Sequence, residues 1–289
     1  MIVAIVGPTG VGKTKLSIEL AKKYNAIIVN CDAMQVYKNL NIGTAKIKET
    51  EKEGIPHYLF DIKDVTENYS VYDYQKDLRN ILNNNKTKNI IIVGGTGLYL
   101  KAGLYDYRFN TEENKADYSQ LSNEDLYKLV LKKDPLTKIH PNNRVRLERF
   151  LTKEQTEFVP PIKLYNHTII GLTTERKNLY DIINRRVDKM LEDGLVNEAK
   201  YFYDRKIKAK PLLAGIGYKE LYEYFANKLT LEQAVEKIKQ NSRHYAKRQY
   251  TFFNHQLEVN WFNVDFANFT NTVKEVEDFI EKENYYDRS

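Results

Sequence analysis

The sequence predicts an α/β fold, in which a doubly wound parallel sheet with a phosphate loop (P-loop) carries a small helical insertion domain and a helical C-terminal part. Three observations support this prediction. Short β-branched runs alternate with helical patterns along most of the chain. The apolar run at residues 2–6 leads directly into a match to the pattern G-x-x-x-x-G-K-[ST] at residues 7–14. Residues 108–161 interrupt the alternation, because they are polar and contain no good strand.

The expected strands are short and apolar, as buried parallel strands are. After the first run they are expected at 27–30, 58–62, 90–93 and 168–172, with a last strand-like piece at 259–264. Helices are expected at 121–131 and 142–151 in the insertion, then from about 179 to Gly194, at 231–253 and at the C-terminus. Gly194 suits a left-handed cap. The predicted domains are a first core segment, the insertion and a second core segment, at 1–107, 108–161 and 162–289.

The composition is that of a folded protein of 289 residues, 42% of them hydrophobic. The formal net charge of +6 and the pI near 9.0 mildly favour an anionic partner. The single cysteine, Cys31, excludes an internal disulfide and leaves no cysteine cluster for a metal, which fits a reducing compartment. No leader pattern and no apolar stretch of membrane-spanning length is found. We therefore expect a cytoplasmic monomer with no membrane contact.

The phosphate-loop match predicts a site for a polyphosphate. Glycines allow successive backbone N–H groups to point at phosphate oxygens, and the following helix adds the positive end of its dipole. Lys13 is expected to reach the outer phosphate, and the Thr14 hydroxyl to ligate Mg²⁺. The pattern leaves open whether the polyphosphate donates a phosphoryl group or departs as a leaving group. The predicted phosphate-binding residues are Gly7, Pro8, Thr9, Gly10, Val11, Gly12, Lys13 and Thr14.

Two further segments follow strands, at the sheet edge where ligands gather in such folds. Asp32, after the second strand, would face the phosphate loop and could ligate Mg²⁺, pair with Lys13 or act as a base. The alternative is that Asp32 only caps a following helix. The run from Gly94 to Gly97 is either a turn that brings backbone close to a ligand or only a turn.

A basic stripe lies on the long C-terminal helix, where Lys239, Arg243 and Lys247 are spaced four residues apart, with His244 and Arg248 beside them. Such a stripe is often only a solvated surface. Aromatic residues interleaved with the charges favour nucleic acid instead, because bases stack on rings and cations meet phosphates. A second basic cluster lies in the insertion, and together the two clusters suggest a polyanion larger than a nucleotide. The second cluster consists of Arg144, Arg146 and Arg149.

Seven motifs occur in order along nearly the whole chain. They are the phosphate loop, 32–37 with 41–46, 54–58, 93–99, 134–135 with 139–142, 216–220 and 242–249. With these motifs the chain resembles the tRNA dimethylallyltransferase family, also called tRNA isopentenyltransferases. The phosphate loop alone is shared by many unrelated enzymes. The block 32–46 and the run Tyr-Ala-Lys-Arg-Gln at 245–249 are far more particular to this family.

The resemblance implies a prenyl transfer. The phosphate loop, with Mg²⁺ at Thr14, would bind the diphosphate of dimethylallyl diphosphate as the leaving group, and Lys13 would assist its departure. Asp32 would be the general base for the exocyclic amine (N6) of the adenosine on the 3′ side of a tRNA anticodon. Thr96 would lie beside the base and the reacting carbon. The expected contacts to the tRNA anticodon stem-loop are Asp32, Ala33, Met34, Gln35, Thr96, Arg146, Arg149, Gly217, Lys219, Arg243, Lys247 and Arg248.

Two other functions fit parts of the same pattern. A nucleotide or small-molecule kinase on this fold would use Asp32 for its acceptor and the insertion as a lid with arginines over the phosphates. A nucleotide-dependent RNA-binding protein would perform no covalent chemistry. The chain also departs from the family it resembles, because its insertion is shorter, residues 148–152 replace the usual Arg-Ala-Leu-Glu-Val, and Ala214 stands where many members have arginine.

Overall fold

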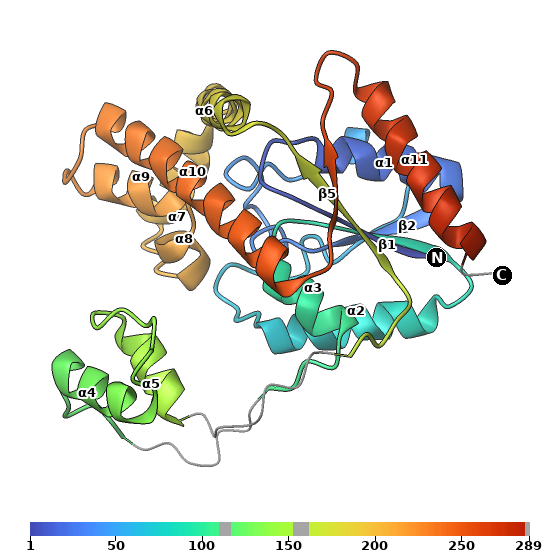
Figure 1. The fold of residues 1–289 in the computed structure, drawn as a ribbon. Helices are drawn as coiled ribbons and strands as arrows, with labels where there is room; N and C mark the ends of the chain where they lie inside the picture. Colours follow the sequence, from blue (N-terminus) through green and yellow to red (C-terminus); the bar gives the residue numbers. More distant parts are fainter. Residues whose placement is uncertain (110–116, 153–161, 287–289) are drawn as a thin grey trace. The chain divides into compact units, whose positions relative to one another are not determined.

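The computed structural model describes residues 1–109, 117–152 and 162–286 and consists of two compact units (Figure 1). The larger unit combines Met1–Asp106 with Lys163–Ser289, and the smaller unit is Tyr107–Ile162. The larger unit holds the sheet, and the smaller one holds two helices. In the described ranges, no helix has the length and apolar content needed to cross a membrane.

Six parallel strands form the sheet in the order β3-β2-β4-β1-β5-β6. Their bounds are β1 Ile2–Val6, β2 Ala26–Asn30, β3 His57–Tyr58, β4 Asn89–Val93, β5 Thr168–Thr173 and β6 Asn260–Asn263. The register pairs Ile5 with Val93 on one side of β1 and Val6 with Gly171 on the other. The carboxyl ends of β4, β1 and β5 therefore lie side by side, and the predicted parallel α/β fold is confirmed.

Helices connect the strands and cover both faces of the sheet. Those of the larger unit are α1 Lys13–Tyr24, the 3-10 turn η1 Glu49–Glu51, α2 Val71–Asn84, α3 Gly97–Leu104, α6 Arg176–Glu192, α7 Leu195–Asp204, α8 Lys210–Ala214, α9 Tyr218–Phe225, α10 Leu231–Gln256 and α11 Phe269–Tyr286. The predicted left-handed cap is present, since Gly194 has φ 101° directly after the α6 cap.

The core has two layers because β-strand side chains alternate between the faces of the sheet. On one face, Ile28 and Ile91 pack with α1, α6 and α11, for example through Leu16. On the other face, Val29 and Ile92 pack with α2, α3 and α10. Figure 1 shows α1 and α11 on one side of the strands and α2 and α3 on the other. In this doubly wound arrangement the loops that follow the strands come together at their carboxyl ends, where they can form a site.

One predicted strand is wrong over most of its length. The run 58–62 forms a strand only at His57–Tyr58, because Leu59 and Asp61 have φ values of 63° and 53°. Left-handed backbone cannot continue a strand. Asp61 instead turns toward the buried ammonium of Lys46 and accepts a hydrogen bond from its Nζ at 2.5 Å. Residues 59–62 therefore form a turn that supplies Asp61 to an ion pair with Lys46.

The smaller unit is a helix pair, α4 Asn123–Lys133 and α5 Arg144–Thr152, as expected for the insertion. Its core consists of the buried residues Leu126, Val130, Leu147 and Leu151. Arg144 is used inside this unit, where it donates to the Tyr118 and Leu121 carbonyls and pairs with Glu148 at 2.7 Å. Arg146 and Arg149 are exposed on α5.

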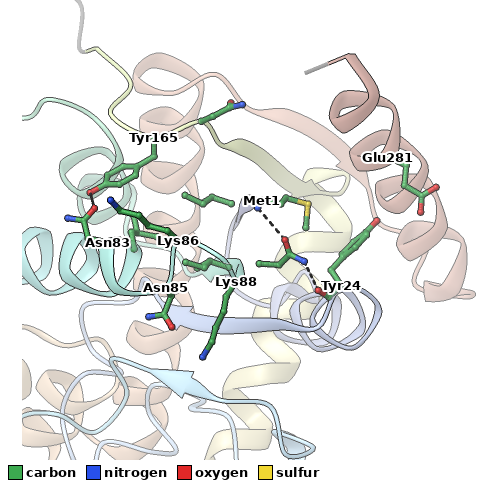
Figure 2. Close-up of a pocket in the computed structure, with 13 residues that line it drawn as sticks. Met1, Tyr24, Asn83, Asn85, Lys86, Lys88, Tyr165 and Glu281 are labelled. Carbon is green, nitrogen blue, oxygen red and sulfur yellow. Dashed lines mark hydrogen bonds between the residues drawn. The ribbon is translucent and has the colours of Figure 1, made fainter. Parts of the chain in front are cut away.

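A pocket of about 800 Å³ lies at the amino ends of β1 and β4 (Figure 2). Its amide side chains are already used within the protein. Asn89 accepts from the α-amino group of Met1 at 3.2 Å and donates to the Tyr24 carbonyl at 2.6 Å, and Asn85 donates to the Ile81 carbonyl. Ligands of doubly wound sheets gather at the carboxyl ends of the strands, which is the opposite edge. The pocket is therefore separate from the candidate site.

Candidate functional site

The phosphate loop connects β1 to α1 at the carboxyl end of the sheet. Gly7, Gly10 and Gly12 have φ values of 134°, 90° and 91°, all in the region that favours glycine. A Cβ atom on Gly7 would lie 2.4 Å from the carbonyl oxygen of Leu172 in β5, so the loop is seated against the neighbouring strand. Val11 is buried, and α1 begins at Lys13. The backbone thus has the conformation required to bind an anion.

Lys13 folds back over this loop. Its Nζ donates to the carbonyl oxygens of Gly7 at 3.0 Å and Pro8 at 2.7 Å. Burial lowers the pKa of Lys13 to about 7, with a smaller lowering by Arg186 and an opposing effect of Asp32. Two cations therefore share a poorly solvated region, and an anion bound there would stabilise the charged form of Lys13. No ion pair joins Lys13 to Asp32 within the described residues, so that predicted alternative is not realised.

Arg186, on α6, is a site residue that sequence reasoning missed. Burial lowers its pKa, whereas the charge of Asp32 acts to raise it, so the guanidinium lies within electrostatic reach of that carboxylate. Ile182 lies one turn earlier on the same face of α6 and packs directly on Gly10. A Cβ atom added to Gly10 would lie 2.7 Å from Cγ2 of Ile182. Arg186 therefore projects from the face of α6 that packs on the phosphate loop. The only signal in the sequence was a basic residue in the first helix after β5.

Asp32 lies two residues beyond the end of β2 in a hydrogen-bonded turn. Its backbone N–H donates to Asn30 Oδ1 at 2.9 Å, and its Oδ1 accepts from the Met34 backbone N–H at 2.9 Å. Residues 33–36 form a turn, so Asp32 caps a turn, and the alternative that it caps a following helix is not found in the structure. Its Oδ2 has no hydrogen-bond partner within the described residues. One carboxylate oxygen thus fixes the orientation, and the other remains available as a base.

Thr96 joins the loop after β4 to the loop after β2. Its backbone N–H donates to the Cys31 carbonyl at 3.0 Å, and its Oγ1 accepts from the Ala33 N–H at 3.0 Å. Tyr245 of α10 belongs to the same cluster. Burial and the charge of Asp32 raise the pKa of the Tyr245 phenol, while a hydrogen bond with Thr96 lowers it. Asp32, Thr96 and Tyr245 therefore converge at one end of the sheet, next to the phosphate loop.

The glycine run at 94–97 is explained by contacts within the protein. A Cβ on Gly94 would lie 2.1 Å from the Cys31 carbonyl oxygen, and one on Gly95 would lie 2.1 Å from Nε2 of Gln249. This Nε2 donates to the Gly95 carbonyl at 3.0 Å in the buried interior. The close approach that glycine permits is thus to β2 and α10, which supports the turn interpretation of these two positions.

We expect Gly95→Ala to lower the free energy of unfolding by roughly 1–3 kcal/mol, because its methyl group would overlap Gln249. Thermal unfolding of the purified variant measures this change. In a Gln249→Ala background the same substitution is expected to cost less, since the overlapping amide is gone. Equal costs in both backgrounds would contradict the proposed clash.

Part of the predicted basic stripe is paired inside the protein. Lys239 forms an ion pair with Asp188 at 2.7 Å, and Arg243 donates to Asn184 Oδ1 at 2.6 Å. Lys247 and Arg248 are exposed and have no acidic partner in the described part of the chain. The Arg248 guanidinium lies 5.6 Å from the centre of the Tyr245 ring. The end of the stripe nearest the candidate site therefore presents unpaired positive charge.

Gly217 and Lys219, also predicted to contact tRNA, lie in a network around the buried carboxylate of Glu220. The Gly217 N–H donates to Glu220 Oε2 at 2.7 Å, and Lys219 pairs with Oε1 at 3.4 Å. Asn241 of α10 donates to the same Oε1 at 2.6 Å. In this structure Gly217 and Lys219 belong to the network by which Glu220 joins α9 to α10. The remaining predicted tRNA contacts are half-buried after β2, namely Ala33, Met34 and Gln35, or exposed on the separate unit, namely Arg146 and Arg149.

A Mg²⁺ ion would find only a partial ligand set in the protein. The described residues contain no group of three or more His, Cys, Asp or Glu side chains that could hold a metal. The Thr14 side chain is exposed at the start of α1 and makes no hydrogen bond within those residues. Mg²⁺ usually keeps several waters and binds through substrate phosphates, so a single hydroxyl ligand is compatible with a magnesium diphosphate.

Comparisons with known proteins show which family the chain belongs to. The model of the family described as IPP transferase matches residues 35–256. A tRNA dimethylallyltransferase of Anoxybacillus flavithermus is 46% identical, with 97% of this chain and 96% of the relative covered, and one of Bacillus subtilis is 45% identical, with 91% and 90% covered. The crystal structure of a full-length tRNA isopentenylpyrophosphate transferase from Bacillus halodurans has a TM-score of 0.78 at 40% identity, covering 100% of this chain and 99% of that one.

A second solved structure extends the likeness beyond bacteria. It is a eukaryotic dimethylallyltransferase described as acting on tRNA, with a TM-score of 0.78, 28% identity, and coverage of 97% of this chain and 79% of that chain. The resemblance seen in the motifs is thus confirmed over almost the whole chain. The family model, the sequence relatives and the shared fold together place the chain in the tRNA dimethylallyltransferase (IPP transferase) family.

Proposed function

We propose that this enzyme transfers a dimethylallyl group from dimethylallyl diphosphate to N6 of the adenosine on the 3′ side of a tRNA anticodon and releases diphosphate. The observation that carries the proposal is the convergence of two sites at one sheet edge. An anion-binding loop with Lys13 and Arg186 lies beside Asp32 and Thr96. A kinase could also use a carboxylate beside its phosphate site, but the family shown by the comparisons is that of the tRNA dimethylallyltransferases, which favours prenyl transfer to an amine.

The leaving group is stabilised by the phosphate loop. The allylic carbon–oxygen bond breaks, and its electron pair stays on the diphosphate, where negative charge increases. Loop N–H groups, Lys13 and Arg186 would surround that position and stabilise the new charge as it forms, an effect of about 3–4 kcal/mol for a single preorganised donor. When bound, Mg²⁺ supplies further neutralisation of the diphosphate, with Thr14 as its protein ligand.

The nucleophile is prepared by Asp32. The N6 lone pair forms the new carbon–nitrogen bond, and the amine proton passes to the carboxylate, with a contribution of about 10²–10⁴-fold in rate. Because Oδ1 is held by the Met34 N–H, the free Oδ2 is the proton acceptor. Thr96 keeps the two loops together through its bond to Ala33 and so fixes the distance between base and nucleophile. The proton later returns to solvent.

The tRNA substrate must bring its target base out of the stacked anticodon loop. Extrusion costs a few kcal/mol, which contacts to the base and the phosphate backbone offset. Ala33, Met34 and Gln35 would line the base, and the unpaired Lys247 and Arg248 would contact phosphates. We propose that the protein acts as a monomer in the cytoplasm, where a reduced Cys31 and a tRNA substrate are both expected.

The test is to incubate the purified protein with unmodified tRNA, Mg²⁺ and dimethylallyl diphosphate and to analyse the digested RNA by mass spectrometry. A prenylated adenosine at the position after the anticodon supports the proposal. Consumption of ATP without prenylation would support the kinase, and RNA binding with neither reaction would support the RNA-binding protein.

Lys247→Ala is expected to weaken tRNA binding and to make its salt dependence shallower. Loss of one phosphate contact should change the slope of log K against log salt by roughly 0.7–0.9. Filter binding across a salt series measures both effects. Lys200→Ala is the matched control, because it removes the same charge from a lysine that is paired with Asp204 on α7. An unchanged slope for Lys247→Ala would remove this residue from the RNA interface.

A further inference from the structure

A single carboxylate, Glu198 on α7, accepts four hydrogen bonds. Its Oε2 accepts from the backbone N–H groups of Asn41 at 2.9 Å and Ile42 at 2.8 Å. Its Oε1 accepts from the Gly43 N–H at 3.0 Å and from the Tyr218 hydroxyl at 2.6 Å. Three successive backbone N–H groups around one carboxylate form an anion-binding nest of the kind that often holds a phosphate. Here the protein fills the nest with its own side chain.

The loop that Glu198 holds leads to Gln35. Directly after Gly43, the carbonyl oxygens of Thr44 and Ala45 accept from Nε2 of Gln35 at 3.0 Å and 3.4 Å. Only the NH₂ group of the amide can donate to two carbonyls, so this contact assigns the nitrogen and oxygen positions of the Gln35 amide. The opposite end, Oε1, makes no hydrogen bond within the described residues. Gln35 therefore presents a hydrogen-bond acceptor in a fixed direction.

Tyr218 supplies the fourth donor from α9. Its ring is fully buried, and a Cβ on Gly43 would lie 2.6 Å from the ring carbon Cζ, so the loop packs directly on the ring. Burial and the neighbouring charge of Glu198 raise the pKa of the Tyr218 phenol, which keeps the hydroxyl protonated and donating. α7, α9 and the loop are thus joined at one carboxylate.

We propose that Glu198 is a positioning residue, which holds the 41–45 loop and thereby orients Gln35 as a hydrogen-bond acceptor toward the extruded nucleotide. This inference rests on the proposed function, in which Gln35 lies against the target nucleotide. Glu198 itself touches neither substrate. Its carboxylate holds the backbone of the loop, and the carbonyl groups of the loop in turn hold the Gln35 amide.

Glutamine cannot take the place of Glu198. Each carboxylate oxygen accepts from two donors, and at least one donor on each oxygen is a backbone N–H. If the glutamine NH₂ group took either oxygen position, it would face a backbone N–H, which is also a donor. That backbone N–H would then have no acceptor. Glu198→Gln therefore changes only the hydrogen bonding of the nest, while the volume of the side chain is kept.

The test measures prenyl transfer to an anticodon stem-loop RNA and, separately, the binding of inorganic diphosphate with Mg²⁺. Glu198→Gln is expected to lower kcat/KM for the RNA by about 10- to 100-fold, since a small displacement of a positioning group is costly. The dissociation constant for diphosphate should stay within about twofold, because the four hydrogen bonds of the nest join α7 to the 41–45 loop and α9 and involve no phosphate-loop residue. Glu192→Gln, an exposed carboxylate at the end of α6, is the matched control and should change neither quantity.

Tyr218→Phe provides a second variant that keeps the buried ring and removes one donor. It should lower kcat/KM for the RNA by about two- to tenfold. In the Tyr218→Phe background, Glu198→Gln should cost less than in the wild type, because one of the four donors is already gone. Hydrogen exchange should show faster exchange of the amides of Asn41, Ile42 and Gly43 in Glu198→Gln.

The inference is overturned if Glu198→Gln weakens diphosphate binding as much as it lowers kcat/KM, which indicates a general structural role. It is also overturned if the amides exchange faster while kcat/KM for the RNA stays within twofold of the wild type. Both outcomes require a wild type that transfers the prenyl group. A wild type that leaves the RNA unmodified contradicts the proposed function itself, and the exchange data then still report whether Glu198 holds the loop.

Discussion

Asp32→Asn is expected to lower kcat for prenyl transfer by about 10²–10⁴-fold while leaving tRNA affinity within about twofold of the wild type. Asparagine keeps an oxygen that can accept from the Met34 N–H, so the turn that orients the side chain is preserved. The substitution removes only the ability to take a proton from N6. Asp32→Ala should abolish transfer as well, but it also removes the turn and is therefore less specific.

The measurement is single-turnover transfer with saturating RNA, combined with equilibrium binding of the same RNA. Asp64→Asn is a suitable control, because Asp64 is an exposed carboxylate with a long ion pair to Lys38 at 3.9 Å. If Asp32→Asn kept more than about a tenth of the wild-type rate, Asp32 would contribute less than a general base should.

Lys13→Met is expected to lower kcat by about 10²–10³-fold and to weaken diphosphate binding, because it removes a preorganised cation from the leaving group. Lys15→Met is the control, since that lysine lies over the Phe269 ring at 4.7 Å. Calorimetric titration with magnesium diphosphate measures the affinity. Transfer by Lys13→Met at the wild-type rate would exclude a role for this ammonium in the departure of diphosphate.

The same lysine predicts a pH dependence of diphosphate binding in the wild type. The pKa of Lys13 in the free protein is about 7, so above pH 7 the side chain is increasingly neutral. Bound diphosphate favours the charged form, so binding must take up a proton there. The contribution of Lys13 to affinity is therefore complete below pH 7 and decreases by up to about tenfold per pH unit above it. This component should be absent in Lys13→Met.

The sequence was sufficient to predict the sheet and to bring the segments of the candidate site to one edge of it. The phosphate loop, Asp32 and Thr96 each follow a strand, and parallel strands bring their carboxyl ends to one edge. Local pattern was enough because each of these residues is placed by its own strand. The failure at 58–62 has a local cause as well, since the apolar run could not show that Leu59 adopts left-handed backbone.

The residues that sequence reasoning missed depend on packing between distant segments. Arg186 reaches the phosphate loop only because α6 packs on Gly10, and its own helix gives no motif. Lys239 looked like part of an RNA-binding stripe, yet Asp188 neutralises it from α6. Glu198 lies more than 150 residues along the chain from the loop it holds. A glutamate within a helical pattern gives no sign that its carboxylate accepts hydrogen bonds from four donors.

The contact between Gly7 and the carbonyl oxygen of Leu172 has a consequence for biosynthesis. The ribosome makes the phosphate-loop residues first, but the strand that seats them and the helix that carries Arg186 appear only after the whole inserted unit. A nascent chain that ends before residue 172 contains the complete loop sequence without the surface that shapes it. Diphosphate binding should thus arise late in translation, after β5 and α6 have both been made.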